Sequence, residues 1–373
     1  MDSKQEIKNS EIDTQIQGHL REILALVEKK NIASNISKAR RFSLFPIQDE
    51  VSYKFFKKQE GATWSANEMD FVRDKMDYEN LPPKQKHLIN LILGFFSPAD
   101  GLVSENLLFR FLMECETYEE KAMFIAQLFI ELVHAETYSL AIMTYIPDPV
   151  KQQEVFDMAN NLPCVKTKTD WIERYMNSEE PRVVRLAAFA IAEGVFFSML
   201  FSIIFWFRSK GVMQIFAFSN EQISKDEGLH RDYGAYLFRK LFSQISDSKE
   251  REAVQEKVLQ IMRDAVDIES SFIDNLVPDP IDDLNKEDLH QYCHVVADNL
   301  LATLELPTIW NDPVPASMSW MNDISLSQKN NFYEIAVGSY KNFSLTDALD
   351  WKKRAGVSEN MVDAIQNSEN VDF

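Results

Sequence analysis

Two elements of the form Glu-x-x-His, Glu131-Leu-Val-His134 and Glu227-Gly-Leu-His230, restrict the possible folds of this chain more than any other feature. Each lies inside a long stretch of apolar residues with helical periodicity. Because residues three apart on a helix share one face, each element presents a carboxylate and an imidazole side by side. If the two helices pack together, these four groups form one polar cluster inside the protein.

An acidic residue precedes each element at a similar distance. Asp100 lies 31 residues before Glu131, and Glu193 lies 34 residues before Glu227. Each separation is long enough for one helix, a connection and the start of the neighbouring antiparallel helix. The pattern therefore reads as a quasi-repeat in which four helices bring four carboxylates and two imidazoles to one place.

This set of side chains suits a pair of divalent metal ions. One acid from each of two helices, together with Glu-x-x-His from each of two others, is the ligand pattern of ferritin-like di-iron proteins, although Asp100 replaces one expected Glu here. Four carboxylates neutralise and bridge two divalent ions, and imidazoles shift the preference from Mg, Ca or Mn toward Fe. We therefore predict an all-α, ferritin-like helical bundle with a di-iron carboxylate site in its core.

Each part of the pattern also has an ordinary structural interpretation. A single Glu-x-x-His is usually a solvated helix face or an ion pair. Glu193, however, lies between Ala190-Ile191-Ala192 and Val195-Phe196-Phe197, where a carboxylate is costly unless it is paired or binds a metal. Asp100 follows Ser-Pro-Ala, so a loop or a helix start is also open for it.

The remaining pattern favours one long-helical domain. Only 10 Gly and 13 Pro are present, which fits long uninterrupted helices. A capping-box match, Ser65 to Glu68, precedes the first helical pattern. We expect a polar N-terminal extension over residues 1–40, a ferritin-like di-iron domain over 41–345, and a flexible C-terminal tail over 346–373. Helices are predicted over residues 86–111, 119–145, 155–176, 181–208, 220–242, 250–275 and 288–304.

Charge and composition argue against several classes of protein. The formal net charge of −19 is unsuited to nucleic-acid binding, which needs a basic face. The apolar run over residues 195–207 is too short to span a bilayer and is bracketed by Glu193 and Arg208, so we expect a buried helix and no membrane association. Three cysteines without a CxxC pair, and an N-terminus without a signal-peptide core, predict reduced thiols and a cytoplasmic protein.

Two other metal motifs are incomplete. His134-Ala-Glu136 and Pro163-Cys164 match parts of the zinc deaminase signature, but Thr167 stands where the second cysteine should be. His290 and His294 are four residues apart but lack an acid at matching spacing. A core or surface role is the favoured interpretation for this pair.

Several stretches resemble the small, radical-generating subunit of class I ribonucleotide reductases of the eukaryotic and viral type. They are RRFSLFPI, the W-x-x-x-E-x-D that begins at Trp64, FFSPADGLVSEN and NEQISKDEGLH. The resemblance extends over nearly the whole chain from about Arg40. It is carried by the ordered set of motifs, since a lone Glu-x-x-His is a weak signal.

The resemblance implies roles for individual residues. Tyr138 would be the radical tyrosine, and its position four residues after His134 places it one turn along the same face. Trp64 and Asp226 would transfer electrons and protons, with Asp226 orienting the imidazole of His134. Tyr340 would pass the radical to the large subunit. The acidic, Phe-ending tail would dock this chain on that subunit. The implied iron ligands are Asp100, Glu131, His134, Glu193, Glu227 and His230, and the implied apolar radical pocket contains Phe197, Phe201 and Ile223.

The implied activity is that of a ribonucleoside-diphosphate reductase, active only with the large subunit. Two Fe(II) would reduce O2 and end as an oxo-bridged di-iron centre while Tyr138 is oxidised, with an additional electron arriving near Trp64. A homodimer is also implied. Three alternatives remain: another ferritin-like di-metal oxidase or hydroxylase, an iron-storage protein or non-radical regulatory paralogue, and a centre that contains Mn in place of Fe.

Overall fold

The computed structural model describes residues 43–157, 161–318, 320 and 321. Within helices, the side chains at positions 97, 98, 100, 102 and 176 are not described. The predicted N-terminal extension, Tyr340 and the predicted C-terminal tail lie outside the described residues. The boundaries that we assign to these segments stay predictions.

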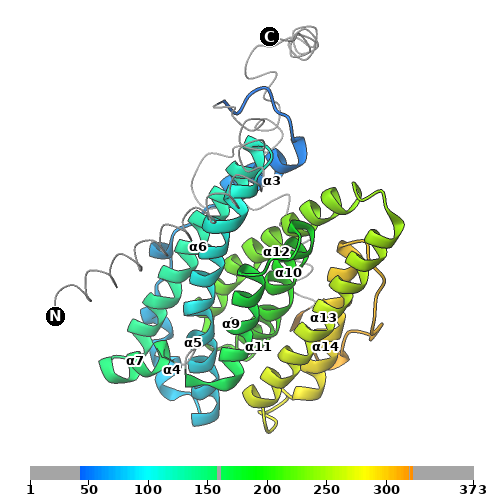
Figure 1. Cartoon of the computed structure of the whole chain (residues 1–373). Helices are drawn as coiled ribbons and strands as arrows, with labels where there is room; N and C mark the ends of the chain where they lie inside the picture. Colours follow the sequence, from blue (N-terminus) through cyan, green and yellow to red (C-terminus); the bar gives the residue numbers. More distant parts are fainter. Residues whose placement is uncertain (1–42, 158–160, 319, 322–373) are drawn as a thin grey trace, which may run out of the picture.

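The described part of the chain is built from helices and contains no β-strand, only an isolated bridge between Ile281 and Leu284 (Figure 1). The all-α prediction is therefore confirmed. The α-helices are α3 (Glu50–Gly61), α4 (Lys75–Asn80), α5 (Pro83–Asn106), α6 (Tyr118–Tyr145), α7 (Pro149–Phe156), α9 (Pro163–Met176), α10 (Arg182–Ile191), α11 (Ser198–Ser209), α12 (Gln214–Phe242), α13 (Ser248–Leu276) and α14 (Lys286–Thr303).

Short polar side chains begin five of the eleven described α-helices by accepting hydrogen bonds from free backbone N–H groups. Thr117 accepts from Glu120 N at the start of α6, and Asp247 accepts from Lys249 N and Glu250 N at the start of α13. The capping box at Ser65 is present, but it starts only the 3-10 turn Ala66–Glu68. Local chemistry thus determines where these elements begin.

The prediction of one helix over residues 155–176 is wrong. The chain forms α7 and α9 as separate helices, and α9 begins at Pro163 after an extended Leu162 (φ −97°, ψ 116°). Proline lacks an N–H and disfavours helical backbone in the residue before it, so it starts a helix more readily than it continues one. Helix α3 was not predicted, although Asp49 caps it and Gly61 ends it.

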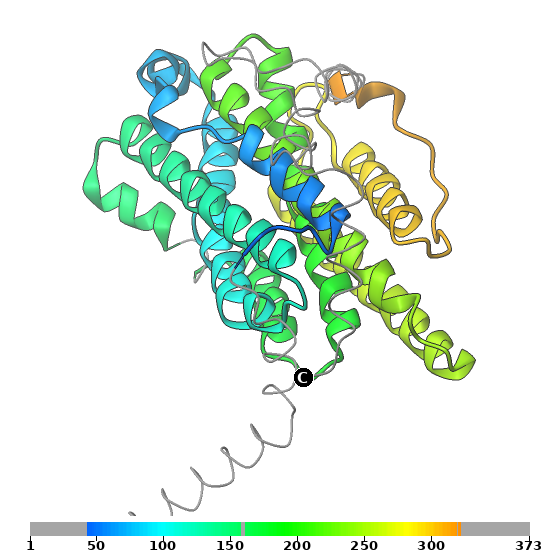
Figure 2. The same cartoon turned by 90° about the horizontal axis from the view of Figure 1, so that it is seen from above.

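The central helices pack in two pairs, α5 against α6 and α10 against α12 (Figure 1). Helix α3 lies across the bundle and contacts both α6 and α12 (Figure 2). Helices α13 and α14 pack against each other beside this core. The apolar interior of the bundle therefore lies between the helices that carry the predicted ligands.

The most apolar segment, Arg182–Ser209, is long and apolar enough to cross a membrane. In the described structure, however, 94% of its most apolar window is buried inside the protein. It consists of α10, the π-helical segment η5 (Ala192–Phe196) and α11. It is the core helix that the sequence predicts, and it ends shortly before Gly211, which adopts a positive φ of 77°.

Candidate metal centre and its tyrosine

Three core elements bring five of the six predicted ligands together. Helix α6 carries Glu131 and His134, α12 carries Glu227 and His230, and η5 carries Glu193, all at most 3% exposed. One ligand atom each from Glu131, Glu193, Glu227 and His230 lies within 4.8 Å of those of the other three. This density of buried acids is unusual unless a cation occupies the centre.

The imidazoles lie between the carboxylates rather than beside them. His134 Nδ1 is 3.3 Å from Glu131 Oε2 and 3.1 Å from Glu227 Oε1. His230 Nδ1 is 3.0 Å from Glu131 Oε1 and 3.2 Å from Glu227 Oε2. Both rings therefore direct the same nitrogen, Nδ1, toward the acidic cluster.

The other ring nitrogens are held by a second set of polar side chains. His134 Nε2 is 3.1 Å from Asp226 Oδ2, and Trp64 Nε1 donates to the same oxygen at 2.8 Å. His230 Nε2 is 3.0 Å from Gln59 Oε1, and Gln59 Nε2 donates to Asp226 Oδ1 at 2.9 Å. These acceptors fix the proton of each imidazole on Nε2, which leaves the Nδ1 lone pairs for a metal.

Electrostatics in the cluster favour cations. Burial alone would lower the pKa of both imidazoles, but the neighbouring carboxylates outweigh it. The close carboxylates of Asp226, Glu131 and Glu227 hold the pKa of His134 well above its usual value, and Glu131 and Glu227 raise the pKa of His230 to about 9. Although burial opposes it, the two imidazoles hold the pKa of Glu227 below its usual value. Metal ions that bind here would displace protons from both histidines.

Three atoms show directly that the cluster fits a cation. Glu131 Oε2, His134 Nδ1 and Glu227 Oε1 are fully buried and close together, yet none makes a hydrogen bond of acceptable geometry. Buried polar atoms normally have such a partner. Lone pairs that converge without hydrogen bonds are the arrangement that a metal ion satisfies.

Glu193 lies on a helical irregularity, because η5 is a π-helical turn between α10 and α11. Such turns recur at functional sites since they re-aim side chains within a helix. The next residue, Gly194, packs so closely that an added Cβ would lie 2.9 Å from the side chains of Arg231 and Leu300. The turn and the glycine together position the Glu193 carboxylate in the core.

The sixth predicted ligand, Asp100, lies on α5, which packs against α6. Its side chain is outside the described part of the structure. The backbone at this position lies in the interior of α5, so neither the loop nor the helix start that the sequence left open is present.

Tyr138 is completely buried, one helical turn beyond His134. Its ring stacks on Phe96 with centroids 4.7 Å apart and an interplanar angle of 2°, and its hydroxyl donates to Asn220 Oδ1 at 2.8 Å. Phe197 and Phe201 lie 5.5 and 5.2 Å from the Phe96 ring. The predicted apolar pocket residues Phe197, Phe201 and Ile223 are all buried.

Comparison with known proteins identifies the family. The sequence profile described as ribonucleotide reductase, small chain, matches residues 41–316. The chain belongs to this family. Small chains of ribonucleoside-diphosphate reductase from Spisula solidissima and variola virus are 38% and 37% identical to it, over 90% and 83% of this chain and 86% and 94% of theirs.

Two solved structures support the ferritin-like fold of this small chain. The dimanganese(II)-NrdF of Streptococcus sanguinis superposes with a TM-score of 0.70 at 20% identity, covering 75% of this chain and 98% of that one. The Rnr4 homodimer of Saccharomyces cerevisiae gives 0.67 at 26% identity, covering 84% and 99%. The predicted family and fold class are confirmed.

Sequence reasoning missed four residues of this small-chain site: Phe96, Asn220, Gln59 and Gln127. Gln127 Nε2 lies 3.3 Å from Glu131 Oε1 and 3.4 Å from Glu193 Oε1, and so joins two helices. Phe96 and Gln127 each lie four residues before a predicted ligand, which is a usable signal. Gln59 lies on the unpredicted helix α3, and nothing in the sequence distinguishes it from an exposed glutamine.

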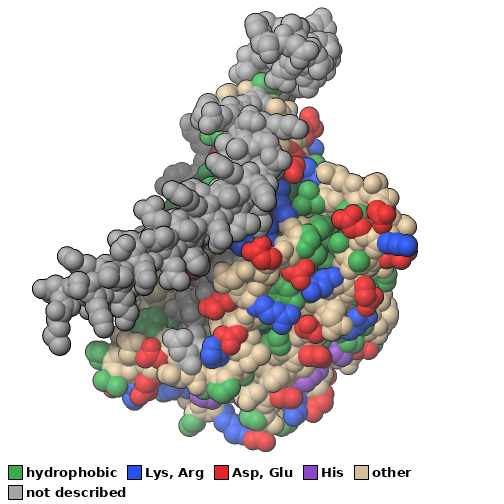
Figure 3. Space-filling model, viewed as in Figure 1, with side chains coloured by type: hydrophobic (Ala, Val, Ile, Leu, Met, Phe, Trp, Pro, Cys, Tyr) green, Lys and Arg blue, Asp and Glu red, His purple; other side chains and the backbone are tan. Residues whose placement is uncertain are grey.

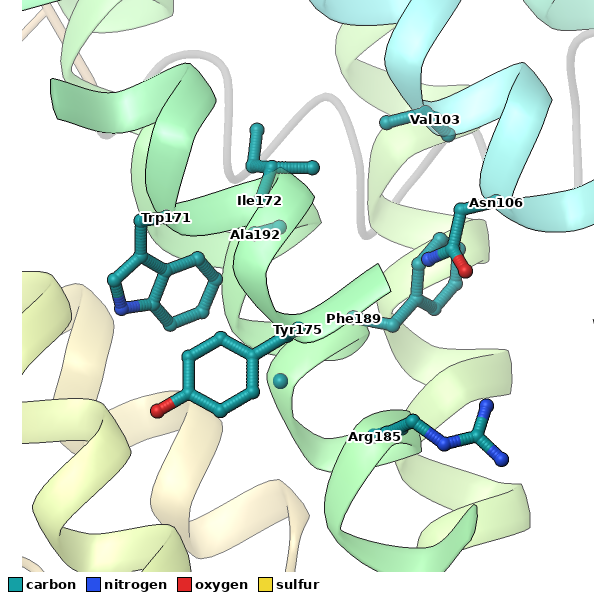
Figure 4. Close-up of a pocket in the computed structure, with 9 residues that line it drawn as sticks. Val103, Asn106, Trp171, Ile172, Tyr175, Arg185, Phe189 and Ala192 are labelled. Atoms are coloured by element: carbon teal, nitrogen blue, oxygen red, sulfur yellow. The ribbon is translucent and has the colours of Figure 1, made fainter. Parts of the chain in front are cut away.

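One cavity borders Ala192, the residue before Glu193, and it is small. It has a volume of about 10 Å³ and is bordered by Ala192 and by the rings of Trp171, Tyr175 and Phe189, with the Arg185 guanidinium directed away from the first two rings (Figure 4). This is the size of one water-like molecule, whereas drug-sized ligands occupy hundreds of Å³. This cavity cannot hold a nucleotide.

His290 and His294 form surface contacts. His294 Nδ1 lies 2.7 Å from Asp312 Oδ2 and its ring stacks on Trp310, while His290 Nε2 lies 3.3 Å from Asp274 Oδ1. The two rings face different carboxylates, in keeping with the non-metal interpretation.

Proposed function

We propose that this chain is the radical-generating small subunit of a ribonucleoside-diphosphate reductase, that it holds a di-iron centre, and that it forms its radical on Tyr138. The observation that carries the proposal is the combination of the buried carboxylate–imidazole cluster with a fully buried tyrosine one turn away on α6. The family match over residues 41–316 supports it.

The metal would be held by the carboxylates of Asp100, Glu131, Glu193 and Glu227 and by Nδ1 of His134 and His230. Four carboxylates balance the charge of two divalent ions. When bound, two iron ions supply the reduction of O2 that oxidises Tyr138. One relative of known structure is a dimanganese protein, and we propose iron here because the sequence motifs of this chain are of the eukaryotic and viral type.

The remaining residues position groups and exclude water. Phe96, Phe197, Phe201 and Ile223 form an apolar cage that keeps water from an oxidised Tyr138. Asp226 holds the Nε2 proton of His134 and accepts from Trp64, so Trp64 contacts the imidazole through a single carboxylate. We propose that the radical equivalent leaves Tyr138 by way of Trp64 and Tyr340.

The radical would act on a nucleotide bound by a separate large subunit. The C-terminal tail, residues 346–373, would dock this chain there, following the domain at residues 41–345. On the face shown in Figure 3 acidic and basic side chains are interspersed without a continuous basic patch, and this supports a protein partner rather than a nucleic acid. We expect a cytoplasmic homodimer.

The test is to load the metal-free protein anaerobically with two equivalents of Fe(II), admit oxygen, and record EPR and visible absorption. We expect a tyrosyl-radical signal in the wild type. Tyr138→Phe should lose that signal and keep the visible absorption of bound iron. Tyr145→Phe is the matched control, because Tyr145 is a second buried tyrosine two turns further along α6.

Iron absorption without a radical in the wild type would contradict the proposal and favour a di-metal oxidase, hydroxylase or regulatory paralogue. Failure to bind iron, with uptake of manganese instead, would contradict the choice of metal alone. A radical that survives in Tyr138→Phe but disappears in Tyr145→Phe would move the radical to the other tyrosine.

A further inference from the structure

The π-helical turn η5 is contacted from outside by a buried lysine. The side chain of Lys168, on α9, is completely buried, and its Nζ donates to the backbone oxygen of Phe196 at 2.8 Å. Phe196 is the last residue of the turn that carries Glu193. A side chain that enters the hydrogen-bond ladder is one of the few known causes of a helical irregularity. Lys168 therefore meets this segment at the place where its helix departs from α geometry.

The ammonium group of Lys168 is enclosed on its other sides. Glu269 Oε2, on α13, lies 2.7 Å from Lys168 Nζ. The ring centroids of Phe95, Phe196 and Phe272 lie 4.3, 5.3 and 3.9 Å from the same nitrogen. A lysine has a flexible four-carbon stem, so this enclosure by one carboxylate and three rings is what gives its donor a fixed direction.

Stability alone does not explain a charged pair at this position. Burial of an ammonium and a carboxylate costs hydration that their mutual attraction repays only in part, and a well-packed apolar pair of similar volume is often equally or more stable. A methionine at position 168 would fill similar space, but it has no N–H to donate. What the lysine adds is therefore the hydrogen bond to Phe196 O.

The turn has a second side-chain donor, but that one is local. Ser198 Oγ donates to Gly194 O within the same segment, so it moves with the turn and does not connect it to the rest of the bundle. Lys168 belongs to α9, which packs against α5, α10 and α13. Trp171 of α9 and Ala192 of the turn border the same small cavity (Figure 4). The lysine thus links the turn to three neighbouring helices through α9.

We propose that Lys168 is a positioning residue for the metal site: its hydrogen bond to Phe196 O holds the π-helical turn, and the turn directs the Glu193 carboxylate into the cluster. Glu269 keeps the lysine in place. The inference rests on the proposed function, in which Glu193 is a metal ligand. One residue more or less in a helical turn changes the direction of a side chain by about 100°, so relaxation of η5 to α geometry would turn Glu193 relative to α11.

Three variants separate the hydrogen bond from the stability of the pair. Lys168→Met with Glu269→Leu removes the donor and leaves no uncompensated charge. Glu269→Gln breaks the ion pair but keeps the donor, because burial lowers the pKa of Lys168 and a neutral amine still donates. Ser202→Ala is the matched control: Ser202 is also completely buried and donates to a backbone oxygen, that of Met199, but it lies in α11 beyond the turn.

The first measurement is the crystal structure of each metal-free variant, which does not depend on the proposed function. In Lys168→Met with Glu269→Leu we expect residues 192–196 to form ordinary α-helical hydrogen bonds and the Glu193 carboxylate to move away from Glu131 and Glu227. The π-helical turn should remain in Glu269→Gln and in Ser202→Ala.

The second measurement is an anaerobic titration of the metal-free proteins with Co(II), followed by visible absorption. The d–d bands of Co(II) report the number and arrangement of its ligands. Removal of a side chain that orients a metal ligand weakens binding by about 10–100-fold, so we expect a loss of this size and an altered band in Lys168→Met with Glu269→Leu. Glu269→Gln and Ser202→Ala should retain the band and the affinity of the wild type.

The outcomes distinguish this role from a merely structural one. A wild-type turn and a wild-type Co(II) band in Lys168→Met with Glu269→Leu would overturn the proposal. The same changes in Glu269→Gln would also overturn it, because the effect would then follow the ion pair and not the hydrogen bond. A displaced Glu193 with unchanged Co(II) binding would overturn the link to the metal. If the wild type binds no Co(II), the proposed metal centre fails, and the metal-free crystal structures still decide whether Lys168 holds the turn.

Discussion

At the scale of single residues, the pair Lys168 and Glu269 leads to a stability prediction. Both side chains are completely buried, with Lys168 Nζ 2.7 Å from Glu269 Oε2 and donating to Phe196 O at 2.8 Å. Removing one partner leaves a buried charge without compensation. Glu269→Leu should therefore lower the free energy of unfolding by about 3–5 kcal/mol, and Lys168→Met with Glu269→Leu should restore most of it. Urea denaturation measures both, and a double variant as unstable as the single one would contradict the argument.

The same pair makes stability depend on pH. Burial raises the pKa of Glu269 to about 7, from its usual value of 4.5, while the contacts with Lys168 oppose the shift. Between these values the native state holds a proton that the unfolded state has lost, so this contribution to stability falls as the pH rises from about 4.5 to about 7. The free energy of unfolding is measured against pH for the wild type and for the double variant, and the difference between the two curves isolates the contribution of Glu269. A difference that is constant between about pH 4.5 and about pH 7 would exclude this contribution.

The same scale shows what spacing alone can predict. Residues three apart on a helix must share a face, so the contacts between Glu131 and His134 and between Glu227 and His230 followed directly from the sequence. The Asp226 partner of His134 was expected from the family resemblance, but the Gln59 partner of His230 lies on another helix, 171 positions away in the sequence. A neutral amide gives no signal in composition or periodicity, so such second partners appear only once the helices are packed.

At the scale of elements, Asp74 anchors the helix that carries Asp226, Glu227 and His230. Helix α12 has no side-chain cap of its own, since Met213 precedes it with a positive φ of 55°. Asp74 accepts instead from Ile215 N at 3.1 Å and Phe216 N at 2.7 Å, and is 2% exposed. Asp74→Ala should lower the free energy of unfolding by about 2–4 kcal/mol, because it leaves one buried and one partly buried N–H group without a charged acceptor.

The control for Asp74 is Asp148→Ala. Asp148 caps α7 from a solvent-exposed position by accepting from Val150 N, and its loss should cost about 0.5–1 kcal/mol. Urea denaturation gives both values, and hydrogen exchange should show faster exchange at Ile215 and Phe216 in Asp74→Ala alone. If the two variants lose the same free energy of unfolding, burial of the capping carboxylate does not determine how much it stabilises the helix.

Most elements could be predicted from the sequence, and the exceptions have physical causes. Apolar periodicity identified the core helices because packing makes that pattern obligatory. It failed at Pro163, where an extended Leu162 precedes a new helix inside an apparently continuous helical pattern, and at α3, whose face toward the bundle is largely polar. The buried residues of α3 include Ser52, Lys57 and Gln59, so this helix contributes hydrogen bonds to the site rather than apolar area.

At the scale of the whole molecule, one outer face is too apolar to remain in water. Along α6, Ile125, Phe129 and Leu132 are 56%, 53% and 60% exposed, and the adjoining segment after α5 exposes Phe109 and Met113 by 68% and 66%. Contiguous patches of this kind mark interaction sites. A relative of known structure is a homodimer, so a second copy of this chain is the partner that we expect there.

This face gives the last prediction. In an isologous dimer each residue is buried twice, and a Phe or Leu side chain contributes about 1.5–3 kcal/mol. Phe129→Glu with Leu132→Glu should therefore weaken the dimer by at least about 6 kcal/mol, or about 10⁴-fold in Kd. Sedimentation at micromolar concentration should show a folded monomer. Val72→Glu with Met76→Glu is the control, because these residues are 69% and 72% exposed and lie on the segments before α5 rather than on α6 or the segment after α5. A dimer that persists in the first variant, or dissociates in the second, would place the interface elsewhere.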